Sequence, residues 1–240
     1  MKYRERTYRN KISKRGLVSF QVKIDETDLY IGTDSDCRDI AAQSVHRHRK
    51  FIEEYITHNP RFIQSLTPVE ANRFAPPIIR EMTEAAHRCG VGPMASVAGA
   101  IAQNVGLDLM KHSDNVIIEN GGDIFLNHTD KDAVVGIFAG DSPLSYKVSV
   151  RIRNAGVPSG ICTSSGTIGH SLSFGKADAV CVTSQSATLA DAAATAICNR
   201  VKRAADIKHA LDFGLRIEGV TGIVIIVGDT LGVMGDIELA

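Results

Sequence analysis

The sequence predicts an α+β fold in which a mixed or antiparallel sheet packs against alanine-rich helices. From Val18 to Ile24 apolar residues alternate with polar ones, which is the two-residue period of a strand with one solvent-facing side. Several further apolar runs of strand length follow in the second half of the chain. The helical segments come in clusters between these strands. An antiparallel or mixed sheet is therefore favoured over a doubly wound parallel one, in which strands and helices alternate regularly.

The N-terminal half contains a predicted hairpin followed by predicted helices. Asp28–Gly32 (DLYIG) is the expected hairpin partner of the first strand, and the apolar spacing from Arg38 to Thr57 predicts an amphipathic helix. Thr67-Pro68-Val69-Glu70 matches a capping box with proline at the first helical position, which predicts a short helix beginning there. A further helix is expected to begin at Pro76-Pro77 and to end at Cys89-Gly90, because glycine is typical of a left-handed C-terminal cap.

Two segments, Gly92–Met110 and Ser186–Asn199, carry small side chains at helical spacing. Small side chains let another backbone come close, so these helices are expected to pack together or against one sheet. We find no linker or break in composition, and therefore expect residues 1–240 to form a single domain. The remaining strands are expected at Asn115–Leu126, Ala133–Gly140, Tyr146–Arg153, Ala177–Ser184, Leu215–Val220 and Gly222–Leu239.

The composition indicates a soluble cytoplasmic protein. Lys and Arg number 27 and Asp and Glu also number 27, so no net charge favours nucleic acid or a membrane as partner. Five scattered cysteines without a C-x-x-C pair or a signal peptide fit a reducing compartment, and no apolar run approaches the roughly 20 residues of a spanning helix. Basic residues gather in the first fifteen positions and at His46–Lys50. These patches are either solvated surface or a means of attracting an anionic ligand.

Two polar segments in apolar surroundings are candidate ligand sites. Asn120-Gly121-Gly122-Asp123 lies between two strand-like runs, where it is either a plain hairpin turn or a nest whose amides bind an anion. The segment from Ser159 is expected to be a loop, rich in hydroxyls and glycines, that could wrap a phosphate. A structural or a catalytic role is open for His170, which ends this loop. The loop's candidate ligand residues are Thr163, Ser164, Ser165 and Gly166.

Asp191 and Thr195 are the third candidate, because they stand one turn apart in the second alanine-rich helix. A buried carboxylate is costly unless it is paired, so Asp191 needs either a hydrogen-bond network or a cation. Residues four apart on a helix point the same way, and one carboxylate and one hydroxyl could face a small hard cation such as Mg²⁺. The alternative is that Asp191 bonds to nearby backbone amides.

Taken in order, GAIAQNVG (Gly99–Gly106), ENGGDIF, TSSGTIGH and LADAAATAI resemble the ApbE family of flavin transferases, and more closely an uncharacterised ApbE-like branch. The resemblance covers roughly residues 90 to 200. It implies that Asp191 and Thr195 bind Mg²⁺, that a carbonyl of the first alanine-rich helix completes the metal site, and that His170 lies near the transferred group. The family moves FMN from FAD to a threonine or serine of a target protein, so FAD and an acceptor protein are implied as partners.

Three functions are therefore carried forward. The first is a Mg²⁺-dependent transferase or pyrophosphatase acting on FAD or a related nucleotide, with His170 and Asp191 as catalytic residues and Gly121, Gly122 and Asp123 among its cofactor-binding residues. The second is a nucleotide or flavin binder that has lost FMN transfer, because the chain has His170–Phe174 (HSLSF) where the family has H-I-x-D-P, and Gln103 where it commonly has lysine. The third is a protein whose small-residue helices serve only to pack a homo-oligomer.

Overall fold

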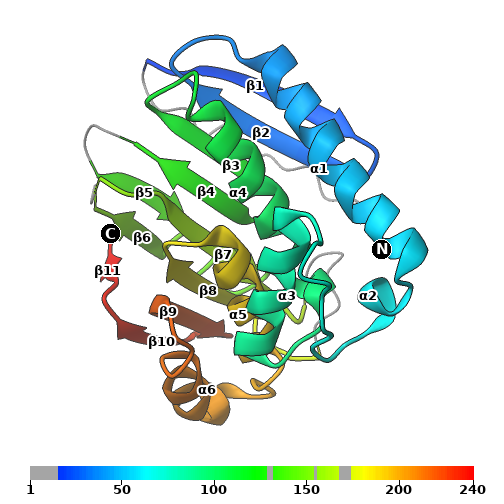
Figure 1. Ribbon diagram of the computed structural model, residues 1–240. Coiled ribbons are helices and arrows are strands. Elements are labelled where there is room, and N and C mark those ends of the chain that lie inside the picture. The colour runs from blue at the N-terminus through cyan, green and yellow to red at the C-terminus, as the bar shows by residue number, and fades with distance from the viewer. Residues whose placement is uncertain (1–15, 129–131, 154–155, 168–173) are drawn as a thin grey trace.

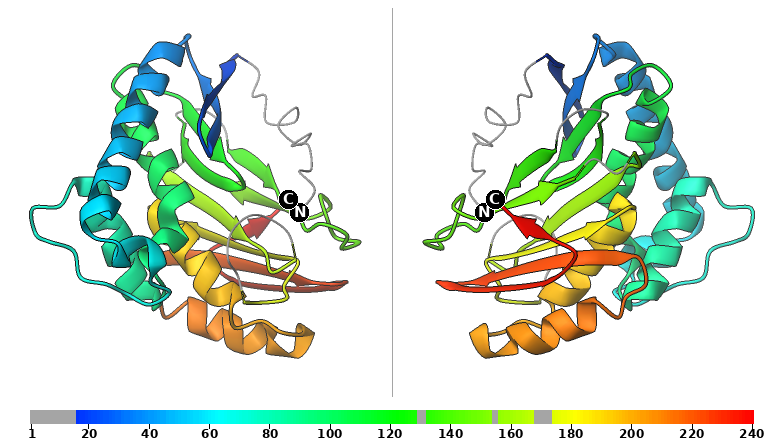
Figure 2. Two further views of the ribbon diagram at one scale, coloured as in Figure 1. Left: turned by 90° about the vertical axis from the view of Figure 1, so that its right-hand side faces the viewer. Right: turned by 90° about the vertical axis from the view of Figure 1, so that its left-hand side faces the viewer.

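A large antiparallel sheet carries the helices on one face and a small sheet on the other (Figures 1 and 2). The computed structural model describes residues 16–128, 132–153, 156–167 and 174–240. Within these residues, eight strands form the large sheet in the order β1-β2-β3-β4-β7-β8-β9-β10, and three form the small sheet in the order β11-β6-β5. All neighbouring strands pair antiparallel, which confirms the predicted fold class.

The strands and helices have the following bounds. The strands of the large sheet are β1 (Val18–Ile24), β2 (Thr27–Thr33), β3 (Val116–Asn120), β4 (Asp123–Asn127), β7 (Ser159–Ser164), β8 (Ala179–Ser184), β9 (Val220–Val227) and β10 (Thr230–Gly235). Those of the small sheet are β5 (Ala133–Gly136), β6 (Ser149–Ile152) and β11 (Glu238–Leu239). The helices are α1 (Arg38–His58), α2 (Arg61–Gln64), α3 (Pro77–Cys89), α4 (Val97–Leu109), α5 (Ala187–Cys198) and α6 (Ile207–Gly214), with 3-10 turns η2 (Pro93–Ser96) and η3 (Ala204–Asp206).

The large sheet separates two hydrophobic cores. On the helix side, residues such as Ile118 and Phe125 pack beneath the helices. On the opposite side, residues such as Ile161 and Val224 pack against the small sheet. Because β5 and β6 lie between β4 and β7 in the chain, while β4 and β7 pair directly, these two strands form an excursion from the large sheet, and β11 from the C-terminus completes the small sheet.

Helix α5 lies at the centre of the helix layer, and all twelve of its residues are buried. Its N-cap is Ser186, whose hydroxyl accepts a hydrogen bond from the Leu189 amide at 3.2 Å. The helix contacts α4, α3, β7 and β8. A Cβ atom at Gly99 of α4 would lie 2.3 Å from the carbonyl oxygen of Ala187, so the two backbones touch there. This confirms that the two alanine-rich helices pack together.

A polar contact joins α1 to α4 at the other end of the helix layer. The Asp108 carboxylate accepts hydrogen bonds from the Ser44 hydroxyl at 2.7 Å and from His48 Nε2 at 2.9 Å, and it forms ion pairs with Arg47 and Lys111. Burial alone raises the pKa of Asp108, but these hydrogen bonds and charges outweigh burial and hold the pKa well below its usual range. Asp108 is therefore ionised and fixes α1 on α4.

The prediction of a helix that begins at Thr67 is wrong. The chain is not helical from Ser65 to Pro76, and a one-turn helix, α2, lies earlier. The Thr67 amide donates to the Ser65 hydroxyl at 3.2 Å, and that hydroxyl donates to the Thr67 carbonyl at 2.7 Å. Thr67 therefore closes a local turn with Ser65 and does not cap a helix.

The strand predicted at Leu215–Val220 is also wrong, because most of this segment forms the turns that end α6. The Leu215 amide donates to the Leu211 carbonyl at 3.1 Å, and the Arg216 amide donates to the Phe213 carbonyl at 3.1 Å. Helix α6 itself was missed, although its buried residues stand three and four apart, which is the period of a helix. They are Ile207, Ala210, Leu211 and Gly214.

The close approach of α4 and α5 makes a first prediction. Gly99→Ala would place a methyl group 2.3 Å from the Ala187 oxygen and 2.8 Å from Asp191 Cβ, so the helices must separate. We expect the free energy of unfolding, measured in urea, to fall by about 1–3 kcal/mol. Gly136→Ala is the matched control, because its nearest neighbour is 3.9 Å away and the substitution should be neutral. Equal stability of the two variants would contradict the observed contact.

The Asp108 contact makes a second prediction. Asp108→Ala leaves the buried Ser44 and His48 side chains without their acceptor, and it should lower the free energy of unfolding at neutral pH by about 2–4 kcal/mol. Lys111→Ala removes a partner that is 70% exposed and should cost less than about 1 kcal/mol. A small loss in Asp108→Ala, comparable to that of Lys111→Ala, would mean that the carboxylate is a surface group with no role in fixing α1.

Candidate functional site

Four polar residues lie on α5 and on the parts of β4 and β7 beneath it, on the helix side of the large sheet. They are Asp123, Ser164, Asp191 and Thr195, which we call the α5 cluster. All four are between 6% and 8% exposed. They come from three elements that lie far apart in the sequence, and Asp191 among them contacts the first turn of α4.

Asp191 and Thr195 lie one turn apart on α5, and both are buried. Oxygen Oδ2 of Asp191 accepts a hydrogen bond from the Gly99 amide at 2.9 Å. This amide is in the first turn of α4, where the helix dipole favours a negative charge. Bonding to amides and binding a cation use different lone pairs of one carboxylate. The two interpretations of Asp191 are therefore compatible.

The β3–β4 hairpin places Asp123 in the cluster. Asn120 and Asp123 are cross-strand partners, and Gly121 and Gly122 have φ angles of 70° and 110° in the two-residue turn between them. The Gly122 amide donates to Glu119 Oε1 at 2.9 Å, so one amide of the predicted anion nest already has a carboxylate partner. The segment is therefore a hairpin turn, as the simpler interpretation predicted, with Gly121 exposed at its tip.

The segment from Ser159, expected to be a loop, is a strand for its first six residues. Thr163 and Ser164 belong to β7, and only Ser165 and Gly166 lie in the turn that follows. The apolar residues Ile161 and Cys162 of this run alternate between the two cores, which is a strand pattern that the many hydroxyls and glycines obscured. The Gly166 amide donates to the Ala177 carbonyl at 2.9 Å. His170, the predicted catalytic histidine, lies outside the described residues.

The two carboxylates of the cluster influence one another electrostatically. Burial raises the pKa of Asp191 to about 7, against the hydrogen bonds from the amides of Gly99 and Ala98. Burial also raises the pKa of Asp123 well above its usual value, and the charge of Asp191 raises it further. Each acid therefore favours a proton or a cation beside it.

The oxygen atoms of the cluster suit a hard divalent cation. Among the described residues, no group of three His, Cys, Asp or Glu side chains is placed to bind a metal, so any site here depends on two carboxylates and hydroxyls. Within the same residues, Asp123 Oδ1 and Ser164 Oγ are buried without a hydrogen-bond partner. Carboxylate, hydroxyl and carbonyl oxygens are the ligands that Mg²⁺ prefers, so the residues present fit the ion.

Two residues that organise the site were not identified from the sequence as such. Asn120 Nδ2 donates to the Ala98 carbonyl at 3.0 Å, and so joins the hairpin to the start of α4. Gln103 accepts a hydrogen bond from the Ser186 hydroxyl at 2.9 Å and donates to Glu81 Oε2 at 3.1 Å, so it joins α4 to the N-terminus of α5 and to α3. An asparagine before Gly-Gly is typical of a turn, which concealed its second role.

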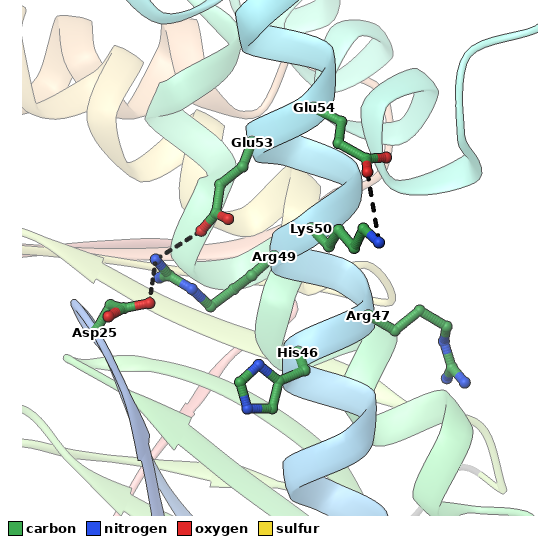
Figure 3. A pocket seen from close by; sticks show the side chains of 7 residues that line it. All are labelled: Asp25, His46, Arg47, Arg49, Lys50, Glu53 and Glu54. Carbon is green, nitrogen blue, oxygen red and sulfur yellow. Dashed lines mark ion pairs between the residues drawn. The ribbon is translucent and has the colours of Figure 1, made fainter.

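Within the basic segment His46–Lys50, a concavity of about 530 Å³ is lined by His46, Arg47, Arg49 and Lys50 together with acidic residues (Figure 3). His48 instead is buried and contacts Asp108 of α4. Arg49 pairs with Asp25, Glu26 and Glu53, and Lys50 pairs with Glu54. These charges are neutralised within the protein, which supports the interpretation as solvated surface.

The fold is that of solved ApbE proteins. The ApbE protein of Thermotoga maritima superposes with a TM-score of 0.60 and 12% identity, over 90% of this chain and 96% of that one. The H257G mutant of the flavin transferase ApbE from Vibrio cholerae superposes with a TM-score of 0.58 and 12% identity, over 91% of this chain and 97% of that one. At this identity the likeness defines the class of fold.

Comparison of sequences identifies the family. The sequence model of the family described as AbpE bacteria matches residues 9–239. A UPF0280 protein of Methanococcus aeolicus is 40% identical over 227 residues, covering 92% of this chain and 91% of that protein. A UPF0280 protein of Methanocaldococcus jannaschii is 41% identical over 224 residues, covering 90% of each. The chain belongs to the AbpE bacteria family, an ApbE-like branch whose similar members carry the name UPF0280.

In the part of the chain that the structure describes, no helix combines the length and the apolar character that crossing a membrane requires.

The raised pKa of Asp191 makes a third prediction. Because its folded-state pKa of about 7 exceeds the unfolded value of ~3.9, the protonated acid is favoured in the fold, and its contribution to stability is lost as pH rises through 7. In EDTA, the free energy of unfolding should fall by on the order of 1–3 kcal/mol between about pH 5 and pH 8. Asp191→Asn should flatten this dependence. An unchanged profile in this variant would assign the dependence to another group.

Proposed function

We propose that this protein is a divalent-cation-dependent enzyme that acts on the diphosphate of a flavin nucleotide such as FAD. The observation that carries the proposal is the α5 cluster, in which a wholly buried helix holds Asp191 and Thr195 beside Asp123 from the Gly-Gly hairpin. Two neighbouring carboxylates in a packed core are destabilising unless a proton or a cation lies beside them.

Membership of the family supports this choice of chemistry. The related fold occurs in proteins named as flavin transferases. In the reaction we propose, one oxygen bridges the two phosphorus atoms of the diphosphate. The bond that breaks joins this oxygen to the phosphorus of the FMN half. The oxygen of a water molecule, or of a serine or threonine of an acceptor protein, forms the new bond to phosphorus, and AMP leaves with the bridging oxygen.

The residues take the following roles. Asp191 and Thr195 would hold Mg²⁺, which when bound supplies positive charge that stabilises the diphosphate and its leaving group. Asp123 and Ser164 belong to the α5 cluster and face the helices. Gly121, Gly122, Thr163, Ser165 and Gly166 adjoin them in the chain and are proposed as further residues of the nucleotide-binding site. His170 is proposed as the acid or base that exchanges a proton with the reacting oxygen.

A second candidate function is a flavin-nucleotide binder without turnover. The sequence favours it, because His170–Phe174 (HSLSF) lacks the Asp-Pro pair of the family motif. The Gly99 amide also satisfies one oxygen of Asp191 without a cation. Gln103, at the position of the family's lysine, is engaged by Ser186 and Glu81. These contacts stabilise the helix layer whether or not catalysis occurs.

Location in the cytoplasm and assembly into a homo-oligomer stay predictions. Helix α5 is enclosed within the protomer, so it offers no face for packing a second copy.

A fourth prediction separates the two functions. The purified protein is incubated with FAD and Mg²⁺ or EDTA, and AMP release is followed by chromatography while ligand binding is followed by thermal shift. An enzyme releases AMP only with Mg²⁺, and Asp191→Asn should lower the rate by about 10²-fold or more, as expected for loss of a metal ligand.

Stabilisation by FAD without AMP supports the binder, because ligand binding raises the melting temperature irrespective of turnover. Thr230→Ala, an exposed change on β10, is the control and should behave as wild type. Absence of both AMP release and FAD-dependent stabilisation, with and without Mg²⁺, would exclude both candidate functions.

A further inference from the structure

Helix α5 covers β7, and the second half of the helix lies above Ser164. A Cβ atom at Gly160 of β7 would lie 2.3 Å from Ala187 Cα, and one at Gly175 would lie 1.9 Å from the Cys198 carbonyl oxygen. Gly175 in turn touches Gly166, just beyond the end of β7. Helix α5 therefore runs in the same direction as β7, with Ala187 above Gly160 and its C-terminus near Gly166. At about 1.5 Å per helical residue and about 3.3 Å per strand residue, Asp191 then lies above Cys162, and Thr195 lies above Ser164.

Asp123 lies on the same side of the sheet as Ser164. Asp123 is the cross-strand partner of Cys162, and Ser164 is two residues further along β7, so all three side chains face the helices. Cys162 confirms this direction, since its thiol donates to the Ala187 carbonyl of α5 at 3.3 Å. The pairing of β4 with β7 thus fixes Asp123 and Ser164 as neighbours under α5.

Two atoms of this group have unused hydrogen-bonding capacity. Asp123 is 7% exposed and Ser164 is 6% exposed. Asp123 Oδ1 and Ser164 Oγ have no hydrogen-bond partner in the described part of the chain. A buried polar atom left unpaired costs about 1–3 kcal/mol, and more for a charged one, so two of them beside a second acid indicate a missing partner.

We propose that Asp123 and Ser164 are cation ligands, and that together with Asp191 and Thr195 they bind Mg²⁺ or Mn²⁺ before any nucleotide is present. The inference rests on the proposed function in placing the cation at Asp191, and it adds a ligand from each of β4 and β7. Two carboxylates supply enough negative charge to hold a divalent ion with water in the remaining positions. The nucleotide diphosphate then binds at a site that already holds the divalent cation.

A buried water or a shared proton could also satisfy these atoms. A water molecule can hydrogen-bond to both unpaired oxygens, and a proton held between two acids removes their repulsion. Neither alternative gives the free protein an affinity for a divalent ion. Metal binding without nucleotide therefore distinguishes the proposal from both.

The fifth prediction tests this directly. EDTA-treated, dialysed protein is titrated with MnCl₂ in the absence of nucleotide, and bound Mn²⁺ is measured by electron paramagnetic resonance and by calorimetry. We expect one site per chain. Asp123→Asn should weaken Mn²⁺ binding at least about tenfold, and Ser164→Ala should weaken it by a smaller factor.

Glu119→Gln is the matched control. Glu119 is a buried acid of the same hairpin, but its oxygen already accepts the Gly122 amide, and glutamine can keep that bond. Its affinity for Mn²⁺ should stay within about threefold of wild type. A merely structural aspartate would leave the Mn²⁺ affinity of Asp123→Asn unchanged.

The outcomes separate this inference from the proposed function. If wild type binds Mn²⁺ without nucleotide, and Asp123→Asn does not, the cation site stands even where FAD is neither bound nor cleaved. If FAD is cleaved with Mg²⁺ but the free protein binds no Mn²⁺, or Asp123→Asn binds it as wild type does, the cation site is wrong and the proposed function stands.

Discussion

The backbone contact of α5 with α4 and β7 is the constraint on which the rest of the site depends. Glycine at positions 99 and 160 lets the backbone of Ala187 come within van der Waals distance of both neighbours. Side chains larger than alanine along α5 would fill the space between the helix and the sheet. The helices therefore pack close to the sheet, and polar groups on α5 lie next to polar groups on β4 and β7.

This close packing determines the electrostatics of the site. Little water reaches the α5 cluster, so interactions between its charges are screened less than at the surface. The amides of Ala98 and Gly99 stabilise one carboxylate, while Asp123 and Asp191 repel one another. The free protein therefore holds an arrangement that a bound cation would relieve. Under the proposed cation binding, stability given up in the free state would become binding free energy for the ion.

The sequence predicted those features that depend on neighbouring residues. Hydrophobic alternation predicted β1, and the terminal glycine predicted the end of α3, because both are local effects. The composition of α4 and α5 predicted their contact, since only small side chains permit it. The turn at Thr67 and the end of α6 were misassigned because competing local hydrogen bonds decided them. The orientation of Asp123 depends on the register between β4 and β7, which joins distant segments and leaves no local pattern.

The order of strands in the chain lets the cover on the back face of the large sheet change without changing the front face. Strands β4 and β7 form their ladder from Asp123 with Cys162 to Leu126 with Ser159, and β5 and β6 leave and re-enter at one end of it. Insertions or deletions within that excursion can alter the cover of the back face while the ladder keeps its register. Relatives can therefore differ in the size and surface of the small sheet, and in what that surface contacts, with the acidic centre on the front face left in place.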